Sequence, residues 1–301
     1  MAKNRLIQQF KKFYITNYPN DMETQIEYFS VFGGLDISVD TSKPLIQLVD
    51  EIILQNFETF EKKIANIINH DYINTRLLHA LAVGDRRIFS AFKRAGLNNG
   101  NGGSALNYLV QEGILTLEYS RETPPEKTNQ KLKRSIARHR ISHKVLFTQP
   151  FIRFWFYFVV RYIKEIRKKE YTNFLNNFKQ KKHSYTSLIF EELSELLLNY
   201  HLRDVQIVSS GSYWDANIEI DILTITNKDE IYIAECKWTN HIINKKELHK
   251  LKEKCERLKI QPKQIIFFSK RGFSKELMQM QSKDLALYSA KDFSILVKKT
   301  F

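Results

Sequence analysis

The sequence of 301 residues has few cysteines and no cysteine motif. Its two cysteines, Cys236 and Cys255, stand apart, and neither belongs to a closely spaced pair with histidines at zinc-ligand intervals. A structural zinc site and a disulfide framework are therefore not indicated. We expect both residues to be free thiols in a reducing compartment.

Long apolar runs are also absent. The longest, FIRFWFYFVVRYI at residues 151–163, is interrupted by Arg153 and Arg161 and falls short of the roughly 20 residues that span a bilayer. The first residues, MAKNRLIQQFKKF, contain no apolar run followed by a small-residue cleavage site. We therefore expect no membrane partner and a cytoplasmic location.

A phosphate-binding loop of the form G-x-x-x-x-G-K-[ST] is missing too. The stretch GLNNGNGGS, residues 96–104, is rich in glycine but lacks the lysine that reaches the phosphates. The chain itself is therefore not expected to be an ATPase.

Positive charge is abundant, with a formal net charge of +14 and an isoelectric point near 9.5. Such a charge attracts polyanions, of which nucleic acid is the commonest in the cytoplasm. The alternative is a general bias toward lysine and asparagine, but that bias would enrich glutamate alongside lysine. The composition favours a nucleic-acid partner, and its 43% apolar content allows two domains with separate cores.

The first part of the chain has helical periodicity. Apolar residues recur at helical spacing over residues 26–68, with a break at Gly33 and Gly34, so residues 1–68 are predicted to form a helical, lid-like segment. Three shorter helical patterns follow, each closed by a glycine where a C-terminal cap would lie: Gly84, Gly96 and Gly113. Two strands, predicted at residues 114–119 and 141–147, complete the pattern of a winged helix over residues 69–150.

The winged helix offers two candidate contacts with nucleic acid. Its third helix, predicted to start with Ser104 as N-cap, would be the recognition helix, with Asn107 and Gln111 on one face. The loop between the strands carries a set of basic residues suited to phosphate contacts: Lys127, Lys131, Lys133, Arg134, Arg138 and Arg140. The alternatives are a solvated loop, and a winged helix that binds protein.

Residues 151–180 are predicted to form a connecting helix, whose aromatic side chains favour packing in a core over base stacking. The polar run KQKKHS, residues 179–184, marks a domain boundary before a second domain at residues 181–301. There the predicted order is a helix at 186–200, strands at 205–209, 218–226 and 231–238, a helix at 244–258, a strand at 264–269, a helix after Gly272, a strand at 285–288 and a last helix. This order predicts a mixed sheet with helices on its faces.

The hairpin IEIDILTITNKDEIYIAECKW, residues 218–238, carries charges inside apolar strands. Because side chains alternate along a strand, Glu235 and Lys237 should share one face and Cys236 the other. Pairing across the turn would bring Asp221 near Glu235, where two carboxylates repel unless a proton or a cation lies between them. Mg²⁺ fits this need, with Mn²⁺ as a substitute, and Lys237 would orient a water or stabilise developing charge.

An E-x-K triplet alone means little, because Glu61-Lys62-Lys63 repeats it in a predicted helix with no partner acid upstream. The second triplet ends an apolar strand, follows an acid by fourteen positions and precedes a basic helix. The alternative is a surface hairpin with a cross-strand Glu–Lys pair.

The segments IEIDIL and IAECKW resemble the signature of the PD-(D/E)XK nuclease superfamily, with Asp221 as the first acid and Glu235-Cys236-Lys237 as the E-x-K. More particularly, the chain resembles the DUF234 group of bacterial and archaeal proteins. The resemblance extends over YFSVFGGL, LLHALAVGD, LVQEGIL, PFIRFWFYFV, IFEEL, YWDANIEID and ECKW. It implies an α+β multidomain protein: a mainly helical N-terminal winged-helix region and a C-terminal three-layer α/β/α mixed-sheet nuclease-like domain.

The resemblance also implies further residues and a partner. In the superfamily an acid on the helix before the first strand often completes the metal site, and Glu191 matches it, with Glu192 and Glu195 as rivals; a surface salt bridge is the other explanation of Glu191. Glu219 matches the extra acid of the group's E-I-D triplet and would be auxiliary. The group commonly carries an AAA+ ATPase in front, which is missing here, so a separate AAA+ ATPase is an implied partner.

We therefore expect an Mg²⁺-dependent endonuclease that hydrolyses phosphodiester bonds of double-stranded DNA. Its catalytic residues would be Asp221, Glu235, Lys237 and Glu191, and its metal ligands Asp221, Glu235 and Glu191. The alternatives are a catalytically silent DNA-binding regulator and an accessory subunit that docks a separate ATPase.

Overall fold

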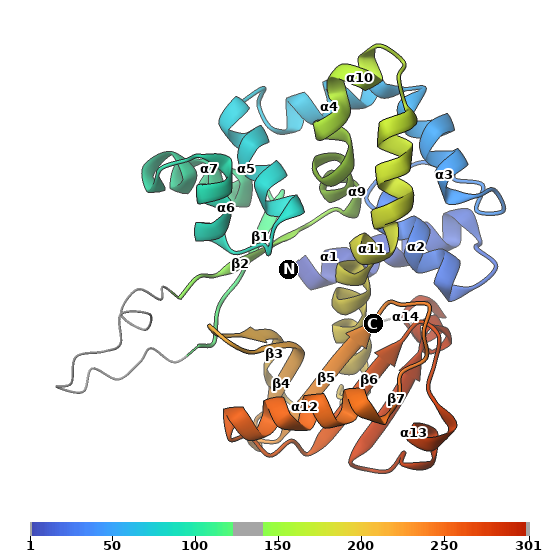
Figure 1. Ribbon diagram of the computed structural model, residues 1–301, viewed down its shortest axis with the longest axis vertical. Helices are drawn as coiled ribbons and strands as arrows, with labels where there is room; N and C mark the ends of the chain where they lie inside the picture. Colours follow the sequence, from blue (N-terminus) through green and yellow to red (C-terminus); the bar gives the residue numbers. More distant parts are fainter. Residues whose placement is uncertain (1, 123–140, 299–301) are drawn as a thin grey trace.

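The computed structural model describes residues 2–122 and 141–298 (Figure 1). Its first part is helical, as predicted. Up to residue 68 the elements are α1 (Ala2–Asn17), α2 (Met22–Phe32), α3 (Leu45–Leu48), the π-helix η1 (Val49–Leu54) and α4 (Phe57–Ile67). The chain leaves α2 at the predicted glycine pair, where Gly34 has a φ of +86° that a side chain would strain.

Three helices and a small sheet follow, in the order predicted for a winged helix. They are α5 (Tyr72–Val83), α6 (Ile88–Ala95), α7 (Asn99–Gln111), β1 (Leu115–Glu118) and β2 (Lys144–Phe147). The strands pair antiparallel, from Leu115 opposite Phe147 to Glu118 opposite Lys144. Gly96 ends α6 in the left-handed conformation that a C-terminal cap requires.

The predicted start of α7 is wrong. Ser104 lies inside this helix, whose N-cap is Asn98; the side chain of Asn98 accepts a hydrogen bond from the Asn101 amide at 2.8 Å. One of the glycines before Ser104 has a packing reason, since a Cβ atom on Gly102 would come within 2.7 Å of the Phe92 ring. The helix therefore runs through a stretch whose composition suggests a loop.

The single connecting helix predicted over residues 151–180 is also wrong. Four short helices occupy its first part: α9 (Pro150–Phe154), η2 (Trp155–Val159), η3 (Val160–Tyr162) and α10 (Ile163–Arg167). After a turn in which Lys169 has positive φ, α11 (Thr172–His201) begins. The aromatic side chains are core residues, as predicted; Phe154, Trp155 and Phe158 are all at most 2% exposed.

The polar run KQKKHS does not end a helix, because α11 continues through it for 30 residues. Lysine and glutamine are good helix formers, and the buried stripe of the helix continues on both sides of the run through Phe174, Phe178 and Tyr185. The predicted boundary therefore falls in the middle of a helix, and the division into domains stays a prediction.

The C-terminal part is a five-stranded mixed sheet with the order β3-β4-β5-β6-β7. Its strands are β3 (Ile207–Trp214), β4 (Glu219–Thr226), β5 (Ile231–Lys237), β6 (Gln264–Ser269) and β7 (Leu285–Ser289). The first three strands pair antiparallel, whereas β6 is parallel to β5 and to β7. This mixed sheet confirms the fold class expected from the sequence.

Helices cover both faces of this sheet (Figure 1). On one face α11 packs against β3, β4 and β5. On the other, α12 (Lys245–Leu258) and α13 (Lys275–Gln279) pack through Leu248, Leu251 and Leu277 onto Ile233 and Phe267. The chain ends in η4 (Ala290–Ser294) and α14 (Ile295–Lys298). The α11 face shares one continuous apolar cluster with the N-terminal helices and with β1 and β2.

Candidate functional site

The site lies where β4 and β5 separate. Their backbone pairing ends at Ile222 opposite Ala234, one residue before Asp221 and Glu235 would face each other. On its other side β4 has an irregularity at this point, because Gly211 pairs with Leu223 but Tyr213 pairs with Ile220. Such bulges are over-represented next to active sites, since they redirect a side chain. Here Asp221 Oδ2 accepts a hydrogen bond from the Cys236 amide at 2.7 Å.

Glu235 and Lys237 share one face of β5, as predicted, and α12 covers this face. Cys236 lies with the cluster on the α11 face, and the odd-numbered neighbour Ile233 lies with α12. The Glu235 side chain is 10% exposed and forms two ion pairs, at 2.5 Å with Lys237 and at 2.9 Å with Lys254 of α12. Burial alone would raise the pKa of Glu235, but the two ammonium groups outweigh burial and lower it.

On the α11 side of the site, the pKa values of the acids are raised instead of lowered. Burial raises the pKa of Glu191 to about 7, and that of Glu192 also to about 7, although Arg86 opposes both shifts. Burial and then the charges of Glu191 and Glu235 raise the pKa of Asp221 well above its usual range. Asp221 therefore interacts with carboxylates on both faces of the sheet, and the charges of Glu191 and Glu235 both disfavour the charged form of Asp221.

Residues of the predicted winged helix lie directly over this end of β3 and β4. The Lys144 ammonium pairs with Glu219 and lies 4.4 Å from the centre of the Trp214 ring, whose Nε1 donates to the Ser142 carbonyl at 3.0 Å. The Lys144 side chain is only 2% exposed. The Glu219 carboxylate is thereby bound to a lysine of β2.

Two further side chains complete this contact. Glu118 of β1 accepts hydrogen bonds from the amide and the hydroxyl of Ser212, at 3.0 and 2.7 Å. The Arg121 guanidinium donates to the backbone carbonyls of Gly211, Ser212 and Leu223. A hollow of about 20 Å³ remains between α11, β4 and β1, and its lining includes Arg86, Glu118, Glu191, Glu192, Glu195 and Asp221.

The carboxylates of Asp221, Glu191 and Glu235 are chemically suited to bind a hard divalent cation. Mg²⁺ prefers carboxylate oxygens, and a carboxylate has about four lone-pair sites, so an ion pair with lysine does not exhaust Glu235. Within residues 2–122 and 141–298, however, no group of three or more His, Cys, Asp or Glu side chains is arranged to hold a metal ion. Binding would therefore require Asp221, Glu191 and Glu235 to rearrange.

The structure brings most of the predicted acids and the lysine together. Asp221 interacts with both Glu191 and Glu235, and Lys237 contacts Glu235. Glu192 and Glu195, the rivals of Glu191, line the same hollow. The predicted recognition residues Asn107 and Gln111 are both exposed on α7. The basic loop residues lie outside the described part of the chain: Lys127, Lys131, Lys133, Arg134, Arg138 and Arg140.

Sequence reasoning missed the residues that reach the site from other elements. Lys254 contacts Glu235 from α12, and Glu247 of the same helix lies 4.0 Å from Lys237. Arg86 and Lys144 come from the predicted winged helix. The basic composition of α12 was the one signal that could have indicated Lys254.

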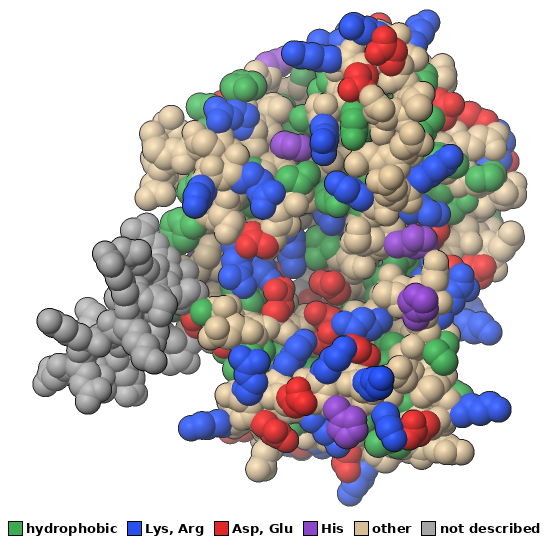
Figure 2. Space-filling view, in the orientation of Figure 1, with side chains coloured by type: hydrophobic (Ala, Val, Ile, Leu, Met, Phe, Trp, Pro, Cys, Tyr) green, Lys and Arg blue, Asp and Glu red, His purple; other side chains and the backbone are tan. Residues whose placement is uncertain are grey.

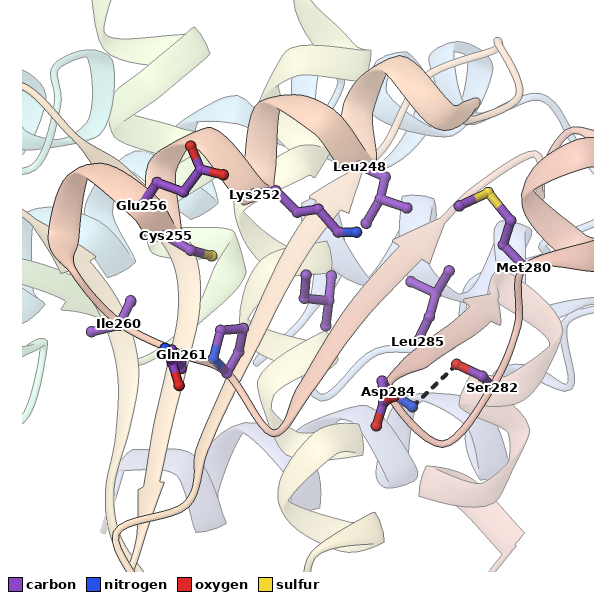
Figure 3. Close-up of a pocket in the computed structure, with 12 residues that line it drawn as sticks. Leu248, Lys252, Cys255, Glu256, Ile260, Gln261, Met280, Ser282, Asp284 and Leu285 are labelled. Atoms are coloured by element: carbon purple, nitrogen blue, oxygen red, sulfur yellow. Dashed lines mark hydrogen bonds between the residues drawn. The ribbon is translucent and has the colours of Figure 1, made fainter.

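A separate cavity in the described part of the chain is lined by none of these acids (Figure 3). It measures about 550 Å³ and lies between α12 and the loops that flank β6 and β7. Its lining includes Leu248, Cys255, Ile265, Met280 and Leu285, and none of the predicted site residues. The lining is mainly apolar, and its two carboxylates, Glu256 of α12 and Asp284 just before β7, are not among the predicted site acids.

Comparisons with known proteins support the family resemblance but assign no activity. Residues 155–251 match the DUF234 family, described as archaea bacterial proteins of unknown function. This match includes α12 up to Leu251 and confirms the resemblance over the segment that carries Glu191, Asp221, Glu235 and Lys237. No curated protein matches the chain.

One solved structure that this chain matches is the crystal structure of protein VC1899 from Vibrio cholerae. The alignment has 14% sequence identity and a TM-score of 0.29, and it covers 83% of this chain. This chain spans about half, 54%, of the length of that structure.

None of the described helices has both the length and the apolar composition needed to cross a bilayer.

Proposed function

We propose that the protein is a divalent-cation-dependent nuclease that hydrolyses phosphodiester bonds in DNA. One observation carries the proposal: Asp221 interacts with two other carboxylates, Glu191 and Glu235, and with the Lys237 ammonium at the end of a strand pair. A like-charged set of buried and partly buried acids is unfavourable unless protons or cations compensate the charge.

In this proposal Asp221, Glu191 and Glu235 hold the cation, which when bound supplies charge to polarise the scissile phosphate and to acidify a water. The raised pKa of Asp221 and the pKa of Glu191 near 7 mean that these acids retain protons near neutrality. Cation binding would therefore release protons and strengthen as the pH rises. Lys237 keeps a partly exposed ammonium beside the acids, where it can stabilise charge that develops on the phosphate.

The test is cleavage of a supercoiled plasmid and of a double-stranded oligonucleotide in Mg²⁺ or Mn²⁺. We expect Asp221→Asn and Lys237→Met to lower the rate by at least about 100-fold, since each removes a group used in the transition state. The matched control is Lys63→Met, which changes the lysine of the other E-x-K triplet, in α4. Full cleavage by Asp221→Asn or Lys237→Met protein would refute the assignment.

A second candidate function is a catalytically silent DNA-binding regulator, or an accessory subunit of a separate ATPase. The observation in its favour is that both oxygens of Glu235 already pair with lysines. Salt-dependent DNA binding that is insensitive to EDTA and to Asp221→Asn, without cleavage in either metal, would support it. Absence of DNA binding by the wild-type protein at low salt would exclude a DNA-binding regulator, and co-purification with an ATPase from the native cell would then test the accessory role.

A further inference from the structure

Helix α12 carries an excess of positive charge next to the candidate site. Its 14 residues, KKELHKLKEKCERL, include six lysines or arginines and three glutamates. One side of the helix is apolar and packs on the sheet through Leu248, Leu251 and Cys255. The remaining sides are open to solvent or face the site, so the charges have two distinct surroundings.

Contacts show which side of α12 faces the site. Lys254 lies 2.9 Å from Glu235, and Glu247 lies within 4.0 Å of Lys237 and 2.6 Å from Lys250. Positions 247, 250 and 254 are three and four residues apart, so they occupy one side of the helix. The opposite flank, with Lys252 and Glu256, lines the apolar cavity instead.

Four basic residues follow this site-facing side. Lys246, Lys250 and Lys254 are spaced by four residues, and Arg257 follows after three; we call these four residues the α12 ridge. Lys246, Lys250 and Arg257 are exposed, whereas Lys254, nearest the site, is partly buried. At 1.5 Å per residue the ridge is about 16 Å long, and its third member, Lys254, forms the ion pair with Glu235.

The surface view is consistent with a basic path. Figure 2 shows lysine and arginine side chains gathered over the lower part of the molecule, where Figure 1 shows α12, with acidic side chains between them. Within the described residues, Lys246 and Arg257 form no ion pair, so their charges are available to a ligand. The length of the ridge matches about five nucleotide steps of 3.4 Å.

We propose that the α12 ridge binds the phosphate backbone of a nucleic-acid strand and leads it to Asp221, Glu235 and Lys237. The proposal rests on the proposed function in that it names the surface through which that site receives its substrate. Ammonium and guanidinium groups supply sequence-independent affinity through release of counterions from the phosphates. Where the ridge meets the site, a phosphate group would replace Glu235 as the partner of Lys254.

The test measures binding without cleavage, by fluorescence anisotropy in EDTA with labelled single-stranded and duplex 20-mers. The variant is Lys246→Gln/Lys250→Gln/Arg257→Gln. Its control, Lys62→Gln/Lys164→Gln/Lys168→Gln, removes the same charge from exposed positions on or beside α4 and α10, at the other end of the molecule (Figure 1). A charge-retaining variant, Lys246→Arg/Lys250→Arg/Arg257→Lys, separates loss of charge from a change in fold.

The slope of log affinity against log salt should become shallower by about 2 for the single strand, or by up to about 3 for the duplex, in the ridge variant. Its affinity at low salt should fall at least about tenfold, whereas the control and the charge-retaining variant should stay within about twofold of the wild type. Equal losses in the ridge variant and the control, or an unchanged slope, would overturn the proposal. So would a wild-type protein that binds neither strand form. Because the assay contains no metal, absence of cleavage bears on the proposed function alone.

Discussion

The pKa values of carboxylates on the two faces of the five-stranded sheet are shifted in opposite directions. On the α12 face, Glu235 has two lysine partners, and its pKa is lowered despite burial. On the α11 face, burial raises the pKa of Glu191 to about 7, and Arg86 compensates only in part. Asp221, between the two faces, is influenced by both acids. The comparison teaches that partners, more than burial itself, decide whether an acid near this sheet is charged at neutral pH.

The largest expected effect comes from removing the partners of Glu235. Lys237→Met/Lys254→Met leaves a 10% exposed carboxylate without a counter-ion, so the free energy of unfolding should fall by about 3 kcal/mol at pH 8. The loss should shrink at pH 4, because protonation of Glu235 removes the uncompensated charge. Urea unfolding at both pH values measures this difference.

The control for this variant is Lys250→Met, whose side chain is 65% exposed and whose ion pair with Glu247 should contribute less than about 0.5 kcal/mol. A loss of the same size at pH 4 and pH 8 in the double variant would show that packing of the lysine chains, not charge, is responsible. The lysine charges would then not explain why the pKa of Glu235 is lowered while that of Glu191 is raised.

The second effect is a gain in stability on the other face. The pKa of Glu191 is about 7 in the folded protein and near 4.3 in an unfolded chain. The folded state therefore binds more protons between these values, and this residue lowers stability as the pH rises from about 4 to about 7. Glu191→Gln should raise the free energy of unfolding by about 2 kcal/mol at pH 8 and by very little at pH 4.

Unfolding in urea at several pH values measures the gain. Glu112→Gln, at an exposed position next to the end of α7, is the matched control and should change stability by less than about 0.5 kcal/mol at either pH. If Glu191→Gln destabilises the protein at pH 8, the charged Glu191 carboxylate is stabilised by a partner, and the contrast with Glu235 does not hold.

The smallest expected effect is a shift in the titration of Glu191 and Glu192 when Arg86 is removed. This guanidinium opposes the rise in the pKa of both Glu191 and Glu192, while Lys144 also lowers and Glu219 raises the pKa of Glu191. Arg86→Met should therefore move the titration midpoint of these acids to higher pH. Carboxyl-selective NMR titration follows the midpoint, and Arg94→Met, at an exposed position of α6, should leave it in place.

Much of the sheet follows from local sequence pattern. The observed bounds of β6 coincide with those predicted, and β4 and β5 differ from theirs by one residue at one end. Alternation of apolar residues and a polar turn specify such strands locally. By contrast, the composition of residues 179–184 suggests a boundary although α11 continues there, because helix continuity depends on the buried stripe on both sides of the run.

The sequence by itself determined the strands that carry Asp221, Glu235 and Lys237, because a period of two and a turn are local properties. Only the tertiary structure decided the charge state of these acids. Lys254 reaches Glu235 because α12 folds back across the sheet, and Arg86 faces Glu191 because the first part of the chain packs onto the last. Electrostatic shifts depend on distances between groups remote in the chain and on exclusion of water, which no local pattern encodes.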